Sequence, residues 1–279
     1  MRQRRRKQRL MFGGGLLLVA VVFTAILLLL SSKGCGPSKA EDGEVEAVPS
    51  AEATEEPTAE PTPTAEPVPS VDISDINSQS GILVRLSDGE VVAEKDADAK
   101  IYPASMTKIM TTIVAIENLK DLDQEITLTN EMFEGLYEQD ATQAGFQPGE
   151  TVRAIDLLYG VMLPSGAECC IALADTIAGS EADFVTLMNE KAAKLGMTGT
   201  NFCDTTGLHD ANHYSTVKDI AVLLKYALKD DTFREIIESP YYSTPGTNIH
   251  PDGITFYSTM FKNLSDTAVT DRKIMGGKT

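Results

Sequence analysis

A serine and a lysine three residues apart, Ser105 and Lys108, begin a stretch with helical patterning. Positions i and i+3 of a helix lie on one face, so the lysine amine can reach the serine hydroxyl. A serine hydroxyl attacks a carbonyl when a base takes its proton, and a lysine is such a base when burial or a second cation favours its neutral form. Free N–H groups at the helix N-terminus would also stabilise the negative charge that develops during acyl transfer. The pair therefore predicts a nucleophile and its base, and the alternative is that Ser105 simply caps the helix.

Other reactive side chains give no comparable pattern. The three histidines, His209, His213 and His250, do not form a metal-binding pair on a helix. The sequence has neither a Gly-x-Ser-x-Gly turn, typical of Ser-His-Asp hydrolases, nor a glycine-rich phosphate loop. We therefore expect no metal and no organic cofactor.

The elements around the serine–lysine pair predict a mixed α/β domain. Residues 80–86 and 91–94 favour a β-hairpin, and residues 105–118 favour a helix with isoleucines at helical spacing. Ser180 and Thr216 each precede an acidic residue by three positions, a variant of the capping box that marks a helix start. Further helices are expected at residues 154–163, 167–178, 181–195 and 220–228. A hairpin followed by a helical middle predicts an α/β domain with segregated layers.

The N-terminal region has a membrane signature. Residues 2–9 carry six basic side chains, and residues 10–32 carry no charge. The apolar core, residues 10–30, has 21 residues, and at ~1.5 Å each they span about the ~30 Å hydrocarbon thickness of a bilayer. The basic flank should remain in the cytoplasm. We expect an uncleaved anchor rather than a cleaved signal peptide, whose apolar region is usually shorter, at ~7–15 residues.

An acidic segment follows the predicted anchor. Residues 41–66 contain nine acidic and no basic side chains, interleaved with Pro, Thr and Ala, so they favour an extended spacer, or alternatively an acidic interaction tail. The formal net charge of −17 argues against a nucleic-acid partner. The predicted organisation is a cytoplasmic basic tail (1–9), a transmembrane anchor (10–32), a disordered acidic linker (33–70) and a catalytic domain (71–279). This describes a single-pass protein of the cell membrane whose catalytic domain lies outside the cytoplasm.

Three motifs resemble those of one enzyme family. The stretch Tyr102-Pro103-Ala104-Ser105-Met106-Thr107-Lys108-Ile109-Met110-Thr111 resembles the first motif region of low-molecular-mass penicillin-binding proteins, the serine-type D-alanyl-D-alanine carboxypeptidases of peptidase family S11. Met162-Leu163-Pro164-Ser165-Gly166 is similar to the second motif, and Gly277-Lys278-Thr279 to the start of the third, Lys-Thr-Gly. The order and spacing of the three motifs make the resemblance specific, since no single motif would suffice.

The resemblance implies a role for each matching residue. Ser105 would form an acyl-enzyme with a peptidoglycan stem peptide, Lys108 would accept its proton, and Ser165 would relay a proton to the leaving group. Lys278 and Thr279 would bind the substrate carboxylate. β-Lactam antibiotics would act as inhibitors, and the physiological role would lie in cell-wall biogenesis and cell shape. The implied fold is the penicillin-binding-protein/β-lactamase-like fold, an antiparallel sheet with a helical cluster.

Two departures from the family pattern leave alternatives open. The second motif ordinarily reads Ser-x-Asn, whereas Ala167 stands here in the Asn position. The glycine of the third motif and the strands that close the sheet would lie beyond Thr279, so we expect the catalytic domain to be incomplete at this end. The alternatives are a catalytically impaired penicillin-recognising or regulatory domain, and a serine β-lactamase, which would need a carboxylate for rapid deacylation.

Overall fold

The computed structural model describes residues 71–263 and 274–279, which belong to one compact unit of the chain, residues 65–279. The predicted basic tail, membrane anchor and acidic linker lie outside the described residues. Within the part of the chain that is described, no helix has both the length and the apolar character needed to cross a membrane.

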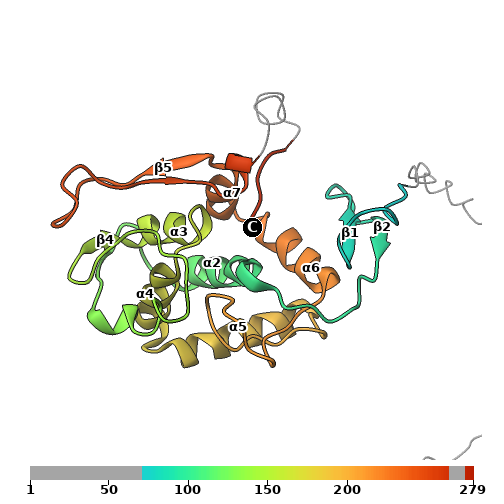
Figure 1. Ribbon diagram of the computed structural model, residues 1–279, viewed down its shortest axis with the longest axis horizontal. Coiled ribbons are helices and arrows are strands. Elements are labelled where there is room, and N and C mark those ends of the chain that lie inside the picture. Colours follow the sequence, from blue (N-terminus) through green and yellow to red (C-terminus); the bar gives the residue numbers. More distant parts are fainter. Residues whose placement is uncertain (1–70, 264–273) are drawn as a thin grey trace, which may run out of the picture. The chain divides into compact units, whose positions relative to one another are not determined.

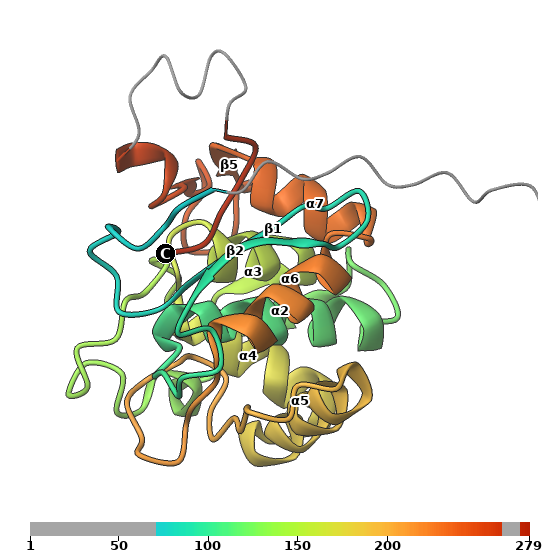
Figure 2. The ribbon, with the colours of Figure 1, turned by 90° about the vertical axis from the view of Figure 1, so that its right-hand side faces the viewer.

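Helix α2 (Thr107–Asn118) lies in the middle of a cluster of helices, as both ribbon views show (Figures 1 and 2). All residues from Thr107 to Ala115 are buried, so this helix is surrounded by protein over most of its length. It contacts helices α3 (Ala154–Met162), α4 (Ala167–Ala178), α5 (Glu181–Leu195), α6 (Val217–Ala227) and α7 (Asp231–Glu238). Because it is packed on all sides, the first turn of α2 is a rigid place for the serine–lysine pair.

Local sequence signals fix the helix boundaries. The helices predicted from periodicity are confirmed, with bounds that agree within three residues. Helix α5 begins where predicted, because the Ser180 hydroxyl accepts a hydrogen bond from the N–H of Asp183 at 3.1 Å. Helix α6 begins three residues before the predicted start because Thr216 accepts from the N–H of Asp219 at 3.0 Å. Helix α7 was not predicted, although Asp230 caps it in the same way.

The described strands form three separate antiparallel pairs. The predicted hairpin is confirmed as β1 (Gly81–Val84) with β2 (Val91–Lys95). The other two pairs are β3 (Glu125–Thr127) with β4 (Thr151–Arg153), and β5 (Tyr241–Ser243) with β6 (Thr255–Tyr257). A single larger sheet was expected, but within the described residues each ladder has only two strands. Each strand of the second and third pairs has only three residues. These two pairs are short ladders between loops and do not extend the β1–β2 pair.

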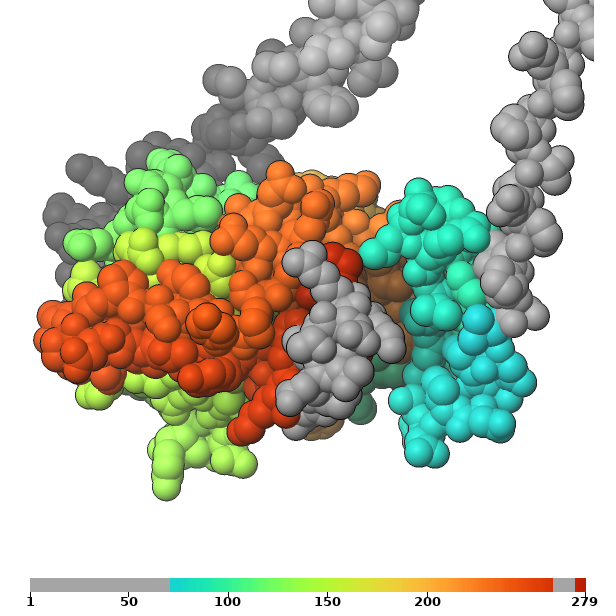
Figure 3. Space-filling view, turned by 90° about the horizontal axis from the view of Figure 1, so that it is seen from above, coloured from blue at the N-terminus to red at the C-terminus, as the bar shows by residue number. Residues whose placement is uncertain are grey.

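The β5–β6 hairpin is attached to the core by one of its faces. Phe256 is buried and meets the ring of Phe146 edge to face at 5.5 Å between centroids, and Tyr242 stacks on Tyr159 of α3 at 3.7 Å. Tyr241 and its cross-strand neighbour, on the opposite face, are exposed, and the space-filling view shows this hairpin at the surface (Figure 3). The alternation is that of a half-buried strand pair. The chain that leaves β6 is thereby held near the loop that follows α3.

Candidate active site

Ser105 lies in a short 3-10 helix, η1 (Ala104–Met106), which leads directly into α2. The preceding residue, Ala104, has φ = 48°, in the left-handed region that only a few per cent of non-glycine residues adopt. The residue at the N-cap of α2 is Met106, and neither η1 nor α2 has a side-chain cap. The alternative that Ser105 simply caps the helix is therefore wrong, and its half-buried hydroxyl is available for other contacts.

Lys108 lies one turn further along, and its side chain is 3% exposed. Its Nζ atom is 3.5 Å from Oγ of Ser105 and 2.6 Å from the carbonyl oxygen of Thr206. The sequence prediction that this lysine reaches the serine is thus met at the outer limit of hydrogen-bond distance. The closer partner, a backbone carbonyl on another segment of the chain, was not predicted.

Ser165 lies in the loop between α3 and α4, and its hydroxyl donates to Oγ of Ser105 at 3.1 Å. Its backbone has φ = 72°, a second left-handed conformation of a non-glycine residue at this site. Such conformations cost ~1–3 kcal/mol each and persist where the surrounding structure enforces them, as at active sites. The N-cap of α4 is Gly166, so Ser165 does not cap this helix.

Lys278 completes a line of polar groups. Its Nζ atom donates to Oγ of Ser165 at 2.9 Å and to the carbonyl oxygen of Thr279 at 2.6 Å. Burial, together with repulsion from Lys108, lowers the pKa of Lys278 to about 8. The structure therefore brings together four of the five residues predicted for the site, Ser105, Lys108, Ser165 and Lys278.

Thr279 is placed differently from the other four. It is exposed, and its hydroxyl lies 2.6 Å from the hydroxyl of Thr259, the second residue after β6. Thr259 in turn donates its N–H to the carbonyl oxygen of Leu163 at 3.2 Å, close to the loop that carries Ser165. Thr279 thus lies at the edge of the site, held there by the chain that leaves β6.

The second motif has an alanine where the family pattern has an asparagine. Ala167, in the Asn position, is buried as the first residue of α4, so no side-chain amide is supplied here. Glu168, the next residue, accepts from the N–H groups of Ala144 and Gly145 through Oε1 at 2.7 and 3.0 Å. Burial raises the pKa of Glu168, and within the described residues its Oε2 atom has no hydrogen-bond partner. This carboxyl fastens a neighbouring loop and does not contact Ser105.

A segment that sequence analysis did not assign to the site, residues 201–215, supplies the partner of Lys108. Close to the site, Gly207 has φ = 84°, and a Cβ there would lie 1.9 Å from the carbonyl oxygen of Ala104. The loop backbone therefore lies directly against the residue before the nucleophile. The available signal was the Thr-Gly pair after Asp204, a typical turn sequence, but nothing in the residue types marks a backbone carbonyl as a ligand.

The described residues contain no group of three or more His, Cys, Asp or Glu side chains placed to hold a metal ion. The four residues can together act as a nucleophile and a proton relay. They supply two hydroxyls, of Ser105 and Ser165, and two amines, of Lys108 and Lys278.

Known proteins resemble this chain both in sequence and in structure. Residues 64–279 match the family described as Peptidase_S11, D-alanyl-D-alanine carboxypeptidase. The chain is 39% identical to D-alanyl-D-alanine carboxypeptidase DacC of Escherichia coli over 172 residues, which are 58% of this chain and 42% of that protein. It is 34% identical to DacF of Bacillus subtilis over 152 residues, 54% of this chain and 39% of that one. The chain thus spans about two fifths of the length of these curated relatives.

Solved structures share the fold. The crystal structure of the Streptomyces K15 DD-transpeptidase superposes with a TM-score of 0.67 at 27% identity, covering 75% of this chain and 82% of that one. A D-alanyl-D-alanine carboxypeptidase from Mycobacterium tuberculosis H37Rv superposes with a TM-score of 0.65 at 28% identity, covering 77% of each chain. The domain therefore has the fold predicted from its motifs.

Proposed function

Because this chain belongs to peptidase family S11, the D-alanyl-D-alanine carboxypeptidases, we propose that it removes the terminal D-alanine from peptidoglycan stem peptides through an acyl-enzyme intermediate. The observation that carries the proposal is the convergence of Ser105, Lys108, Ser165 and Lys278, which come from three distant parts of the chain, within a single chain of polar contacts. A domain that only recognised penicillin would also need a base to acylate its serine, so turnover of a peptide substrate is what separates the two functions.

The acylation step follows from these contacts. Oγ of Ser105 forms a bond to the carbonyl carbon of the penultimate D-alanine, and Nζ of Lys108 takes the hydroxyl proton. Their distance of 3.5 Å is long for proton transfer, and such contacts commonly shorten when substrate binds. The carbonyl oxygen gains negative charge beside the N-terminus of α2, where the helix dipole stabilises it.

Breakdown of the intermediate uses the second serine. The C–N bond to the terminal D-alanine breaks, and its amine takes a proton delivered through the hydroxyl of Ser165, which lies 3.1 Å from Oγ of Ser105. Lys278 and Thr279 bind the C-terminal carboxylate of the substrate, as a cation and a hydroxyl donor. Water then attacks the ester, the shortened peptide leaves as a carboxylate, and Ser105 regains its proton.

A β-lactam would enter the same reaction. Its strained amide carbonyl would be attacked by Ser105, and its carboxylate would occupy the position of the substrate carboxylate beside Lys278. Because the leaving amine stays attached to the adduct, the acyl-enzyme would persist and block turnover. We therefore infer that β-lactam antibiotics inhibit this protein.

The test combines labelling with product release. A fluorescent penicillin should label the full-length protein, Ser105→Ala should abolish labelling, and Lys108→Ala should slow acylation by the ~10²–10⁴-fold typical of a lost general base. Release of D-alanine from a stem pentapeptide distinguishes an active enzyme from an impaired recognition domain. Rapid loss of the penicillin adduct would favour a β-lactamase. Labelling that persists in Ser105→Ala would refute the assignment of the nucleophile.

We also propose that the protein is held in the cell membrane by one helix over residues 10–32, with its catalytic domain outside the cytoplasm. The proposal rests on the six basic side chains of residues 2–9 and the uncharged stretch that follows. Peptidoglycan lies outside the cytoplasmic membrane, so this orientation would bring the enzyme to its substrate. A protease added to intact cells should cut the acidic linker, and protection of that linker until lysis would contradict the orientation.

A further inference from the structure

The orientation of Lys108 depends on a backbone carbonyl. Its Nζ atom lies 2.6 Å from the carbonyl oxygen of Thr206 but 3.5 Å from Oγ of Ser105, so the carbonyl is its closer partner. The amide that family resemblance would place beside this lysine is absent, because position 167 is alanine. Whatever sets the position of the Thr206 carbonyl therefore sets the position of the lysine amine.

Asp204 shapes the turn that presents this carbonyl. Its Oδ1 atom accepts from the N–H groups of Thr206 and Gly207 at 2.7 and 2.6 Å, and from the Thr206 hydroxyl at 2.9 Å. Burial raises the pKa of Asp204, but the hydrogen bond and charge of His213 and these backbone donors outweigh it and lower the pKa below its usual value. The carboxylate is thus ionised and its hydrogen bonds are charge-assisted.

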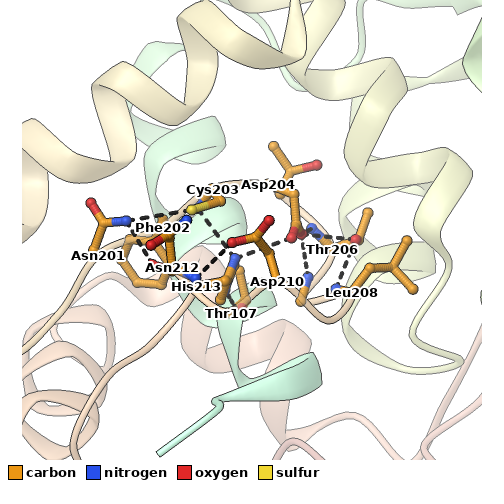
Figure 4. A network of polar contacts seen from close by, with 12 residues as sticks. Thr107, Asn201, Phe202, Cys203, Asp204, Thr206, Leu208, Asp210, Asn212 and His213 are labelled. Carbon is orange, nitrogen blue, oxygen red and sulfur yellow. Dashed lines mark hydrogen bonds and ion pairs between the residues drawn. The ribbon is translucent and has the colours of Figure 1, made fainter. Parts of the chain in front are cut away.

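His213 links this turn to the helix that carries the lysine (Figure 4). The ring is 2% exposed, with Nδ1 3.1 Å from Oδ2 of Asp204 and Nε2 2.8 Å from the hydroxyl of Thr107. Thr107 is fully buried, begins α2 and directly precedes Lys108. Whichever ring nitrogen carries a proton, the ring contacts Asp204 through Nδ1 and the Thr107 hydroxyl through Nε2, so one side chain joins both elements.

We propose that Asp204 and His213 are positioning residues, which hold the Thr206 carbonyl against Lys108 and so direct the lysine amine towards Ser105. The inference rests on the proposed function and deepens it, because it identifies what orients the base when the second-motif amide is missing. Neither residue contacts Ser105, and both act through the backbone of residues 204–207.

The loop has a second attachment, which should keep it folded when Asp204 is replaced. Glu181 accepts from the N–H and the hydroxyl of Thr205 at 3.0 and 2.7 Å. Thr111 of α2 donates its hydroxyl to the carbonyl oxygen of Thr205 at 2.6 Å. Loss of the Asp204 carboxylate should therefore release the Thr206–Gly207 turn without detaching the loop.

The experiment measures penicillin binding and acylation separately by stopped-flow in the full-length protein. Asp204→Ala should lower the acylation rate constant by ~10–100-fold, as expected when a catalytic group is displaced by about 1 Å, while the dissociation constant of the preceding complex stays within about twofold. Asp204→Asn should restore most of the rate, because its amide oxygen still accepts from the N–H groups of Thr206 and Gly207. A role confined to stability would lower the melting temperature without this split between rate and binding.

Two further variants complete the test. Asp121→Ala is the matched control, because Asp121 also accepts a backbone N–H in a turn, that of Asp123 at 2.9 Å, but lies outside this network. It should acylate at the wild-type rate. Thr107→Val keeps the volume and removes the hydroxyl, and it should slow acylation by several-fold, about 3–10-fold. If Asp204→Ala does not fold, the acylation rate of Thr107→Val tests the positioning role.

The outcomes separate the two proposals. A wild-type protein that penicillin does not acylate would overturn the proposed function and this inference with it. In an active wild type, a folded Asp204→Ala protein with an unchanged acylation rate would overturn the inference alone. So would a folded Thr107→Val protein with an unchanged rate if Asp204→Ala fails to fold, or an equal loss of rate in Asp121→Ala.

Discussion

We expect activity to fall above neutral pH because Lys278 loses its positive charge. Burial and repulsion from Lys108 lower its pKa to about 8, from the ordinary 10.5. A lowered lysine pKa means that the cation is lost sooner as the pH rises. The fraction of free enzyme with a charged Lys278 is therefore about nine tenths at about pH 7 and about one tenth at about pH 9.

The magnitude follows from the role proposed for this charge. If a charged Lys278 is needed to bind the substrate carboxylate, kcat/KM should fall by about tenfold between about pH 7 and about pH 9. The loss should appear in kcat/KM, which reports the free enzyme, more than in kcat. A bound carboxylate stabilises the cation and so moves its titration to higher pH.

The assay is release of D-alanine from a stem pentapeptide across this pH range. Lys278→Arg is the informative variant, because an arginine remains charged throughout and should remove the alkaline loss even if its longer side chain lowers the overall rate. Lys278→Met should lower kcat/KM at every pH and also remove the dependence. An alkaline loss of unchanged size and midpoint in Lys278→Arg would refute the assignment to Lys278.

Two further predictions concern stability and use the same structure. Gly207→Ala should lower the free energy of unfolding by about 2–4 kcal/mol, because its φ is positive and the new Cβ would lie 1.9 Å from the carbonyl oxygen of Ala104. Denaturant unfolding should show a smaller loss for Gly179→Ala, which has a similar φ but open space around it, and equal losses would contradict the clash. Burial raises the pKa of Glu168 above 4.5, so its contribution to stability is present at low pH and is lost as the pH rises through the folded-state pKa. Glu168→Gln should remove this decline, so the difference between the unfolding free energies of the two proteins should change with pH, and a pH-independent difference would show that the carboxyl titrates normally.

Local patterns in the sequence were enough to predict that the candidate nucleophile and its candidate base lie together. Ser105 and Lys108 lie one helical turn apart, so their proximity follows from helix geometry whatever the surroundings. Helix boundaries were predictable for the same reason, because the hydroxyl of Ser180 caps its own helix three residues away. The family resemblance, which the later comparisons confirmed, added Ser165 and Lys278 as candidates. It could not give their distances or their charge states.

The tertiary structure decided what happens between segments that are distant in the sequence. Ser165 lies 60 residues after Ser105, and Lys278 lies 113 residues after Ser165, so their contacts exist only once the helices are packed. The same packing buries Lys278 beside Lys108, and burial together with repulsion between the two amines lowers the pKa of Lys278. The local hairpin of β1 and β2 was predicted, but in place of the expected larger sheet the described residues form three two-stranded ladders.

The partner of Lys108 shows most clearly why sequence was insufficient. A carbonyl oxygen is present in every residue, so no residue type at position 206 announces that its backbone will bind a lysine. Its direction is set by the turn around Asp204 and by the buried ring of His213, whose contacts reach back about a hundred residues to Thr107. The sequence thus determined which side chains were available for catalysis, and packing determined how the lysine among them is oriented, because orientation comes from contacts that form only in the folded chain.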